Sequence, residues 1–243
     1  MSIIMEVLLK IMKNQGAYGM RKLFHYLGNI AGIILALAAY SVLQTFYFFP
    51  RRIHKLLHLN VQIQCVMTAL ITVILLAVVF WLYKRQLREF NDWDFNSEPH
   101  WDWRRILIAV VGIVLITLLS YAMMQLVSGG KTISANQKEL NRISLQSGNL
   151  YKIMVCFVAP FCEETIFRGM FFNTFFTRNT FLNKWVGILV SGFVFAYMHD
   201  PRLTKFILVY WVLGCVLGWV YMTTKDLRYS MMTHMAYNLL GFL

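Results

Sequence analysis

Two adjacent glutamates, Glu163 and Glu164, stand in the middle of an apolar stretch of the chain. A charge at the depth of a lipid bilayer costs about 2.5–3.5 kcal/mol, and neighbouring carboxylates repel one another, so we expect one of them to be paired or neutral. Glu164 lies four residues before Arg168, on the same helical face and in the favourable acid-first order. Glu163 is rotated away from that face. The spacing therefore predicts a structural ion pair between Glu164 and Arg168, with Glu163 turned toward a cavity.

A carboxylate that faces a cavity inside a membrane can take a proton from water, which is the work of a general base. Pro160 precedes Glu163 by three residues. A proline at this place starts or kinks a helix and can leave backbone carbonyls open to water. Both observations favour a wet site around Glu163, although two purely structural glutamates remain an alternative.

Two histidines and an asparagine follow in later apolar stretches. His199 ends one stretch, and His234 and Asn238 lie four residues apart in the last one, so they point the same way from one helix. A histidine and an amide on one face can donate hydrogen bonds to a developing oxyanion. Taken singly, each histidine is equally consistent with a bond to a neighbouring carbonyl, and Asn238 with a bond between two helices.

The composition indicates which solvent surrounds these residues. The chain has 243 residues, of which 58% are apolar and 14% charged, and a mean hydropathy of +0.56, whereas soluble domains are about 45–50% apolar and about 25% charged. The solvent is therefore expected to be lipid. The net charge of +12 comes from short basic clusters beside apolar runs, where Lys and Arg meet anionic headgroups. This placement favours the lipid bilayer as the partner and argues against nucleic acid. The four cysteines form no disulfide framework or zinc-like spacing.

A helix needs about 20 mostly apolar residues to span a bilayer. Seven stretches qualify, at about residues 24–49, 61–83, 106–127, 151–176, 182–198, 204–223 and 229–243. We predict an all-α, multi-pass transmembrane bundle of seven to eight helices. Residues 1–22 form an amphipathic segment at the membrane surface, residues 23–149 form N-terminal transmembrane helices and loops, and residues 150–243 form the catalytic core. Residues 128–149 are polar and are predicted to be a solvent loop.

Three ordered motifs resemble those of the CAAX protease and bacteriocin-processing family, also called the Abi family. The motifs are E-E-x-x-x-R at 163–168, F-x-x-x-H at 195–199 and H-x-x-x-N at 234–238. Each motif alone is weak, but three in this order, each in an apolar helix, are specific. The resemblance covers residues 151–243. It implies an eight-helix-like core and hydrolysis of peptides within the membrane by a glutamate.

The resemblance also implies a role for each motif residue. Glu163 with His199 would position and deprotonate the attacking water. His234 and Asn238 would stabilise the tetrahedral oxyanion. The remaining pair, Glu164 and Arg168, would hold this set in place.

Other chemistries remain open. Glu163, His199 and His234 are also zinc-ligand types, but the H-E-x-x-H pattern of zinc peptidases is absent, so we expect no cofactor. Cys162 could serve as a nucleophile, although a thiol in apolar surroundings is rarely ionised. Buried Glu and His also mark ion paths in transporters, but no inverted repeat supports that class.

We predict an intramembrane endopeptidase of the bacterial plasma membrane that cleaves a membrane-associated peptide or protein. Its biological role would be bacteriocin immunity or processing, or the maturation of signalling peptides. Two alternatives are a zinc-dependent CAAX-type prenyl-protein protease and a non-catalytic immunity or scaffold protein that binds a peptide without cleaving it.

Overall fold

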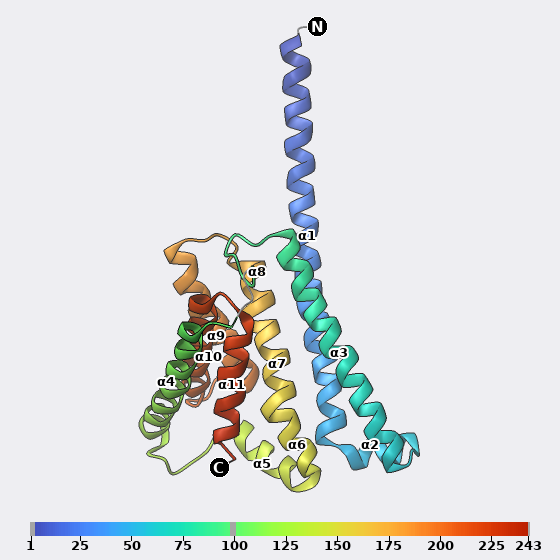
Figure 1. The fold of residues 1–243 in the computed structure, drawn as a ribbon, viewed down its shortest axis with the longest axis vertical. Coiled ribbons are helices and arrows are strands. Elements are labelled where there is room, and N and C mark those ends of the chain that lie inside the picture. The colour runs from blue at the N-terminus through green and yellow to red at the C-terminus, as the bar shows by residue number, and fades with distance from the viewer. Residues whose placement is uncertain (1–2, 98–100, 243) are drawn as a thin grey trace.

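The computed structural model describes residues 3–97 and 101–242, and within these ranges every regular element is helical (Figure 1). The all-α prediction is therefore confirmed. The elements are α1 (Ile3–Phe48), α2 (Pro50–Leu57), α3 (Val61–Glu89), α4 (Trp103–Ser128), α5 (Ala135–Ser147), α6 (Asn149–Ile153), the π-helix η1 (Met154–Val158), α7 (Ala159–Glu164), the π-helix η2 (Thr165–Met170), α8 (Phe171–Phe175), α9 (Phe181–His199), α10 (Ile207–Thr224) and α11 (Leu227–Leu240).

Among the described residues, five helical segments are long and apolar enough to cross a membrane, and they coincide with five of the seven predicted spans. They are Lys22–Phe48, Val61–Glu89, Trp103–Ser128, Phe181–His199 and Ile207–Thr224. The other two predicted spans fall on the helical run from α6 to α8, which is divided into short α- and π-helical elements, and on α11, which has 14 residues. The chain is thus a multi-pass membrane protein.

The run from α6 to α8 lies at the centre of the bundle. It contacts α1 and α3 on one side and α9 and α11 on the other, and Figure 1 shows it between these two groups of helices. The first helix continues without a break from the predicted surface segment into the first span, and its N-terminal part projects beyond the bundle. A surface location for residues 1–22 stays a prediction.

The predicted solvent loop at 128–149 was wrong in part, because α5 occupies most of it. Ser134 caps this helix, since its hydroxyl accepts a hydrogen bond of 3.1 Å from the backbone N–H of Gln137. Gly148, with φ of 56°, ends it. Ile143 and Ser147 are buried, and the Ser147 hydroxyl donates to the Phe48 carbonyl at 2.6 Å. A polar sequence therefore folds as an amphipathic helix against α1.

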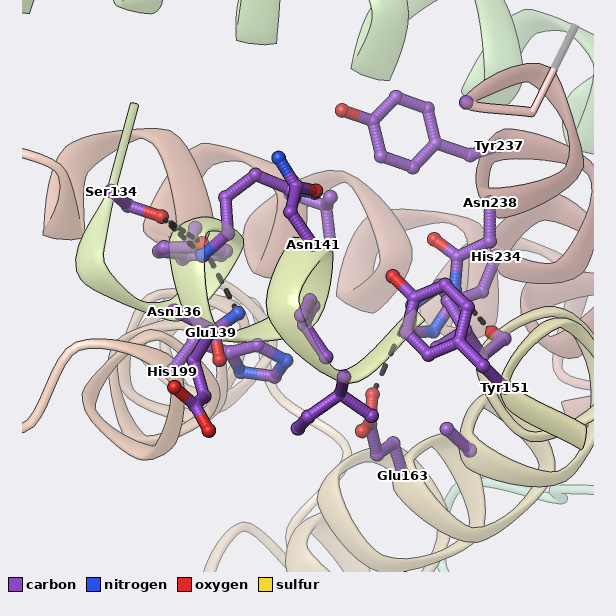
Figure 2. Close-up of a pocket in the computed structure, with 18 of the residues that line it drawn as sticks. Ser134, Asn136, Glu139, Asn141, Tyr151, Glu163, His199, His234, Tyr237 and Asn238 are labelled. Atoms are coloured by element: carbon purple, nitrogen blue, oxygen red, sulfur yellow. Dashed lines mark hydrogen bonds and ion pairs between the residues drawn. The ribbon is translucent and has the colours of Figure 1, made fainter. Parts of the chain in front are cut away.

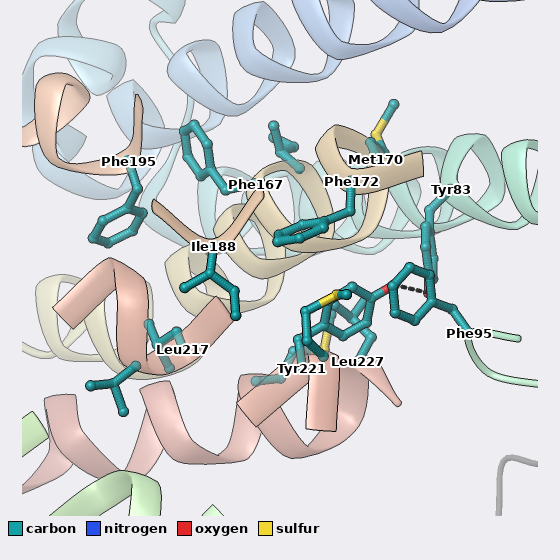
Figure 3. Packing of buried hydrophobic residues seen from close by; sticks show 14 of the residues in the cluster. Tyr83, Phe95, Phe167, Met170, Phe172, Ile188, Phe195, Leu217, Tyr221 and Leu227 are labelled. Carbon is teal, nitrogen blue, oxygen red and sulfur yellow. Dashed lines mark hydrogen bonds between the residues drawn. The ribbon is translucent and has the colours of Figure 1, made fainter. Parts of the chain in front are cut away.

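An aromatic cluster holds the central run against α3 and α10 (Figure 3). Tyr221 stacks on Phe95 with 4.3 Å between ring centroids, and its hydroxyl lies 3.0 Å from that of Tyr83. The ring of Tyr83 covers Gly169 so closely that a Cβ there would lie 2.8 Å from it. Only glycine fits at this position without displacing the ring, and the contact fixes η2, which carries Arg168.

Candidate active site

A cavity of about 1250 Å³ opens between α1, α4, α5, the central run and α9 to α11. Its walls include Glu163, His199, His234 and Asn238. Figure 2 shows these four side chains around the same space, although they come from three separate helical segments. The structure therefore brings the four residues singled out in the sequence to one cavity.

Glu163 is nearly buried, with 8% of its surface exposed, and its two carboxylate oxygens have different surroundings. Oε1 accepts a hydrogen bond of 2.6 Å from the hydroxyl of Tyr40 on α1. Oε2 lies 3.9 Å from Nε2 of His234, which is longer than a hydrogen bond. Oε1 is thus held in place by Tyr40, and Oε2 faces His234 at the wall of the cavity.

Sequence reasoning missed Tyr40, which lies 123 residues before Glu163 and outside every motif. A buried tyrosine hydroxyl needs a hydrogen-bond partner, and Tyr40 begins the polar set Tyr40, Ser41 and Gln44 in the first predicted span. All three line the cavity. That polar set was the available signal, but it does not identify Glu163 as the partner.

Glu164 and Arg168 are fully buried and form the ion pair that their spacing predicts, with 3.2 Å between Glu164 Oε1 and Arg168 Nη1. Arg168 also donates from Nη2 to the Gly214 carbonyl at 2.9 Å, and its guanidinium lies 4.6 Å above the ring of Phe195. These contacts join the central run to α9 and α10. Glu164 therefore has a structural role, as the partner of Arg168.

The same Glu164 oxygen accepts from Nδ1 of His234 at 3.0 Å. An ionised carboxylate can accept hydrogen bonds but cannot donate them, so Nδ1 of His234 carries a proton. Nε2 is then the nitrogen directed toward Glu163. This is the arrangement in which a carboxylate orients an imidazole for catalysis. The structure adds this orienting contact to the predicted role of Glu164.

His199 also lines the cavity. In the described part of the chain, it makes no direct hydrogen bond to Glu163. Its Nδ1 donates to the Phe195 carbonyl at 2.9 Å, since a carbonyl only accepts, which leaves Nε2 as the nitrogen for the cavity. The imidazole ring packs between the rings of Phe195 and Tyr210, with centroid distances of 4.3 Å and 5.1 Å. The Tyr210 hydroxyl lies 2.7 Å from that of Ser134. The cap of α5 and the ring of His199 are thus linked through Tyr210, a second residue that the motifs did not reveal.

Asn238 uses one of its amide protons on the backbone. Its Nδ2 donates to the Val155 carbonyl at 2.8 Å. In η1 the hydrogen bonds run from residue i+5 to residue i, as from the Ala159 N–H to the Met154 carbonyl. The next bond in that register would come from Pro160, which has no N–H. Asn238 supplies the missing donor, so it joins α11 to the central run.

The described residues contain no group of three or more His, Cys, Asp or Glu side chains placed to hold one metal ion. Glu163, His199 and His234 share the cavity but are not gathered around a common point. Cys162, the alternative nucleophile, is fully buried and does not line this cavity.

Comparisons with known proteins match part of the chain to a family model. Residues 146–240 match the model of the type II CAAX prenyl endopeptidase Rce1-like family. The UPF0177 protein YvdC of Lactococcus lactis is 26% identical over 137 residues, which cover 56% of this chain and 51% of the relative. The membrane-embedded CAAX protease MroQ of Staphylococcus aureus is 28% identical over 137 residues, with 54% of each covered.

The matched part thus spans about half the length of these two relatives. A third, the UPF0177 protein YbdI of Lactococcus lactis, is 28% identical over 133 residues and is covered to 69%. No solved structure matches the chain. The relatives are bacterial, and the apolar helices make this a multi-pass protein of a bacterial membrane. Residues 146–240, which match this family model, carry all three motifs, so this part of the chain is similar to the CAAX protease and bacteriocin-processing family.

Proposed function

We propose that this protein is an intramembrane endopeptidase in which Glu163 activates the attacking water. The observation that carries the proposal is the different use of the two glutamates. Glu164 is paired with Arg168 and His234, whereas Glu163 presents one oxygen to a large cavity and has the other oxygen held by Tyr40. Holding one carboxylate oxygen fixes the direction of the second, which is what a general base requires.

In the proposed reaction, Oε2 of Glu163 takes a proton from water while the water oxygen attacks the carbonyl carbon of the peptide bond. His199, through Nε2, positions that water. His234, protonated and held at Nδ1 by Glu164, donates from Nε2 to the oxyanion that forms. The second amide proton of Asn238 adds a further donor. The proton on Glu163 then passes to the leaving amine as the peptide bond breaks. No metal takes part in these steps.

The substrate that fits this cavity is a peptide or protein segment at the membrane. Its walls combine apolar side chains with hydroxyl and amide groups from α1, α4 and α5, such as Gln44, Ser120 and Asn136. Such walls can bind an extended backbone by hydrogen bonds while they exclude bulk water. The biological role follows from the motif resemblance, which implies bacteriocin immunity or processing, or the maturation of signalling peptides.

The test is cleavage of a panel of membrane peptides by the full chain purified in detergent, with products detected by mass spectrometry. Replacing Glu163 by Gln keeps the size of the side chain and removes the base, so we expect turnover to fall about 10²- to 10⁴-fold. His199→Ala should also lose turnover. The matched control is Glu139→Gln, a carboxylate that lines the same cavity but is exposed.

Equal turnover by the wild type and by Glu163→Gln would contradict the proposed mechanism. Binding of peptides without cleavage by the wild type would instead favour the immunity or scaffold alternative.

A further inference from the structure

A second cavity, of about 480 Å³, lies away from the candidate active site. It is bounded by the end of α1, by α2, by the first turns of α3 and by α6. Three basic or imidazole side chains stand at one end, those of Arg51, His54 and Lys55 on α2. None of them takes part in the proposed reaction.

The long wall of this cavity is one stripe of α3. Val61, Cys65, Thr68 and Ala69 recur at helical spacing and line it together. Eight residues of helix rise about 12 Å, and α3 enters its membrane span at Val61. The stripe therefore runs from the end of the helix toward the interior of the bilayer. Apolar side chains of α6 face it from the other side, namely Leu150 and Ile153.

The charges around this cavity have one sign. Arg51 and Lys55 are exposed, and no acidic residue occurs in the sequence between positions 7 and 88. Within the described part of the chain, no acidic side chain lines the cavity either. The neighbouring Arg52 lies over the ring of Phe49 and does not line it. Two cations thus stand where spans begin and end, which is the level of the lipid headgroups.

We propose that this cavity is a binding site for one anionic phospholipid. The phosphate lies against Arg51 and Lys55, and one acyl chain follows the stripe of α3 into the bilayer. A soluble anion would use only the basic end, and a neutral lipid would use only the apolar stripe. An anionic phospholipid matches both ends, and the volume lies within the range of about 300–1,000 Å³ for ligand sites.

The experiment uses the full chain, purified in mild detergent with equal amounts of phosphatidylglycerol and phosphatidylcholine. Native mass spectrometry counts the lipid that the protein retains. We expect the wild type to retain at least tenfold more phosphatidylglycerol than phosphatidylcholine. The double variant Arg51→Gln/Lys55→Gln should lose most of this preference, because each basic residue near the headgroups contributes a factor of about five.

The matched control is Arg52→Gln/Lys131→Gln, which removes two exposed charges that do not line the cavity and should keep the preference. A second pair tests the apolar end. Ala69→Phe fills the stripe and should lower retention, whereas Leu70→Phe places the same side chain one residue further on, outside the cavity, and should not. Equal retention of both lipids by the wild type, or equal losses in a variant and its control, would overturn the proposal.

A third arm separates the phospholipid from a free anion. Cys65 lines the cavity and is exposed, so its alkylation rate reports occupancy. Phosphatidylglycerol should slow the reaction of Cys65 with a membrane-permeant maleimide, and millimolar inorganic phosphate should not. Equal protection by inorganic phosphate would show a plain anion site and would also overturn the proposal.

Discussion

The Tyr40 hydroxyl donates a hydrogen bond of 2.6 Å to Oε1 of Glu163, and it does so from a helix outside the segment that matches the family. The matched residues 146–240 contain the three motifs, but the partner of the proposed base comes from α1. The N-terminal half of the chain therefore completes the candidate site in addition to spanning the membrane.

Removing the Tyr40 hydroxyl should reduce turnover. Tyr40→Phe frees Oε1 of Glu163 and lets the carboxylate turn away from its reactive direction, and this loss of alignment is expected to lower kcat about 10- to 100-fold. The measurement is kcat and KM for a cleaved membrane peptide. A fall in kcat with little change in KM would show that the hydroxyl acts on Glu163 during the reaction.

Tyr47→Phe is the matched control for this variant. Tyr47 is also a buried tyrosine of α1, but its hydroxyl lies 2.9 Å from that of Thr72 instead of contacting Glu163. Its loss should leave kcat within about a factor of two of the wild type, since an ordinary hydrogen bond far from the reacting groups affects mainly stability. Equal kcat values for the two variants would remove Tyr40 from the site.

The buried ion pair makes a stability prediction. Arg168→Gln leaves Glu164 buried without its cation, which typically costs about 3–5 kcal/mol. Arg142→Gln breaks an exposed helical pair with Glu139 and should cost about 1 kcal/mol or less. The comparison is the free energy of unfolding of both variants in detergent. A smaller loss for Arg168→Gln than for Arg142→Gln would contradict the structural role of Glu164.

The bond from Asn238 to the Val155 carbonyl makes a prediction about coupling with Pro160. Asn238→Ala leaves a carbonyl without its donor and should lower the free energy of unfolding by about 1–3 kcal/mol. Pro160→Ala restores a backbone N–H in the π register, so Asn238→Ala should cost less in that background. A double-mutant cycle measures the coupling, and strictly additive losses would contradict this account of η1.

Metal removal tests whether the proposed hydrolysis proceeds without a metal ion. Glu163 and the two histidines act on water and on the oxyanion directly, so turnover should persist after dialysis against EDTA and 1,10-phenanthroline. The assay is repeated with added zinc as the reference. Activity that disappears with the chelators and returns with zinc would show the zinc-dependent alternative to be correct.

The spans could be predicted from the sequence because long apolar runs leave few other structures available in lipid. The pairing of Glu164 with Arg168 was predictable for a similar reason, since both residues lie on one helix and helical geometry decides which side chains meet. Helix α5 was missed because its polar composition resembles that of a loop, although Ser134 and Gly148 are ordinary helix boundary signals.

Tyr40 and the Asn238 contact could not be derived in this way. The bond from Tyr40 to Glu163 depends on how two distant helices pack, and no periodicity encodes that distance. The bond from Asn238 to Val155 depends on a π register that shifts the hydrogen bonds by one residue. Pro160 indicates that a carbonyl is left open, but only the packed structure shows which side chain reaches it.

The most direct test of the proposed base is the cleavage rate of a single membrane peptide by Glu163→Gln, with binding of the same peptide measured in parallel. The proposal predicts that binding stays within a few fold of the wild type while kcat falls at least about 100-fold. Wild-type kcat in Glu163→Gln, with the peptide bound equally well, would contradict the proposal that Glu163 activates the water.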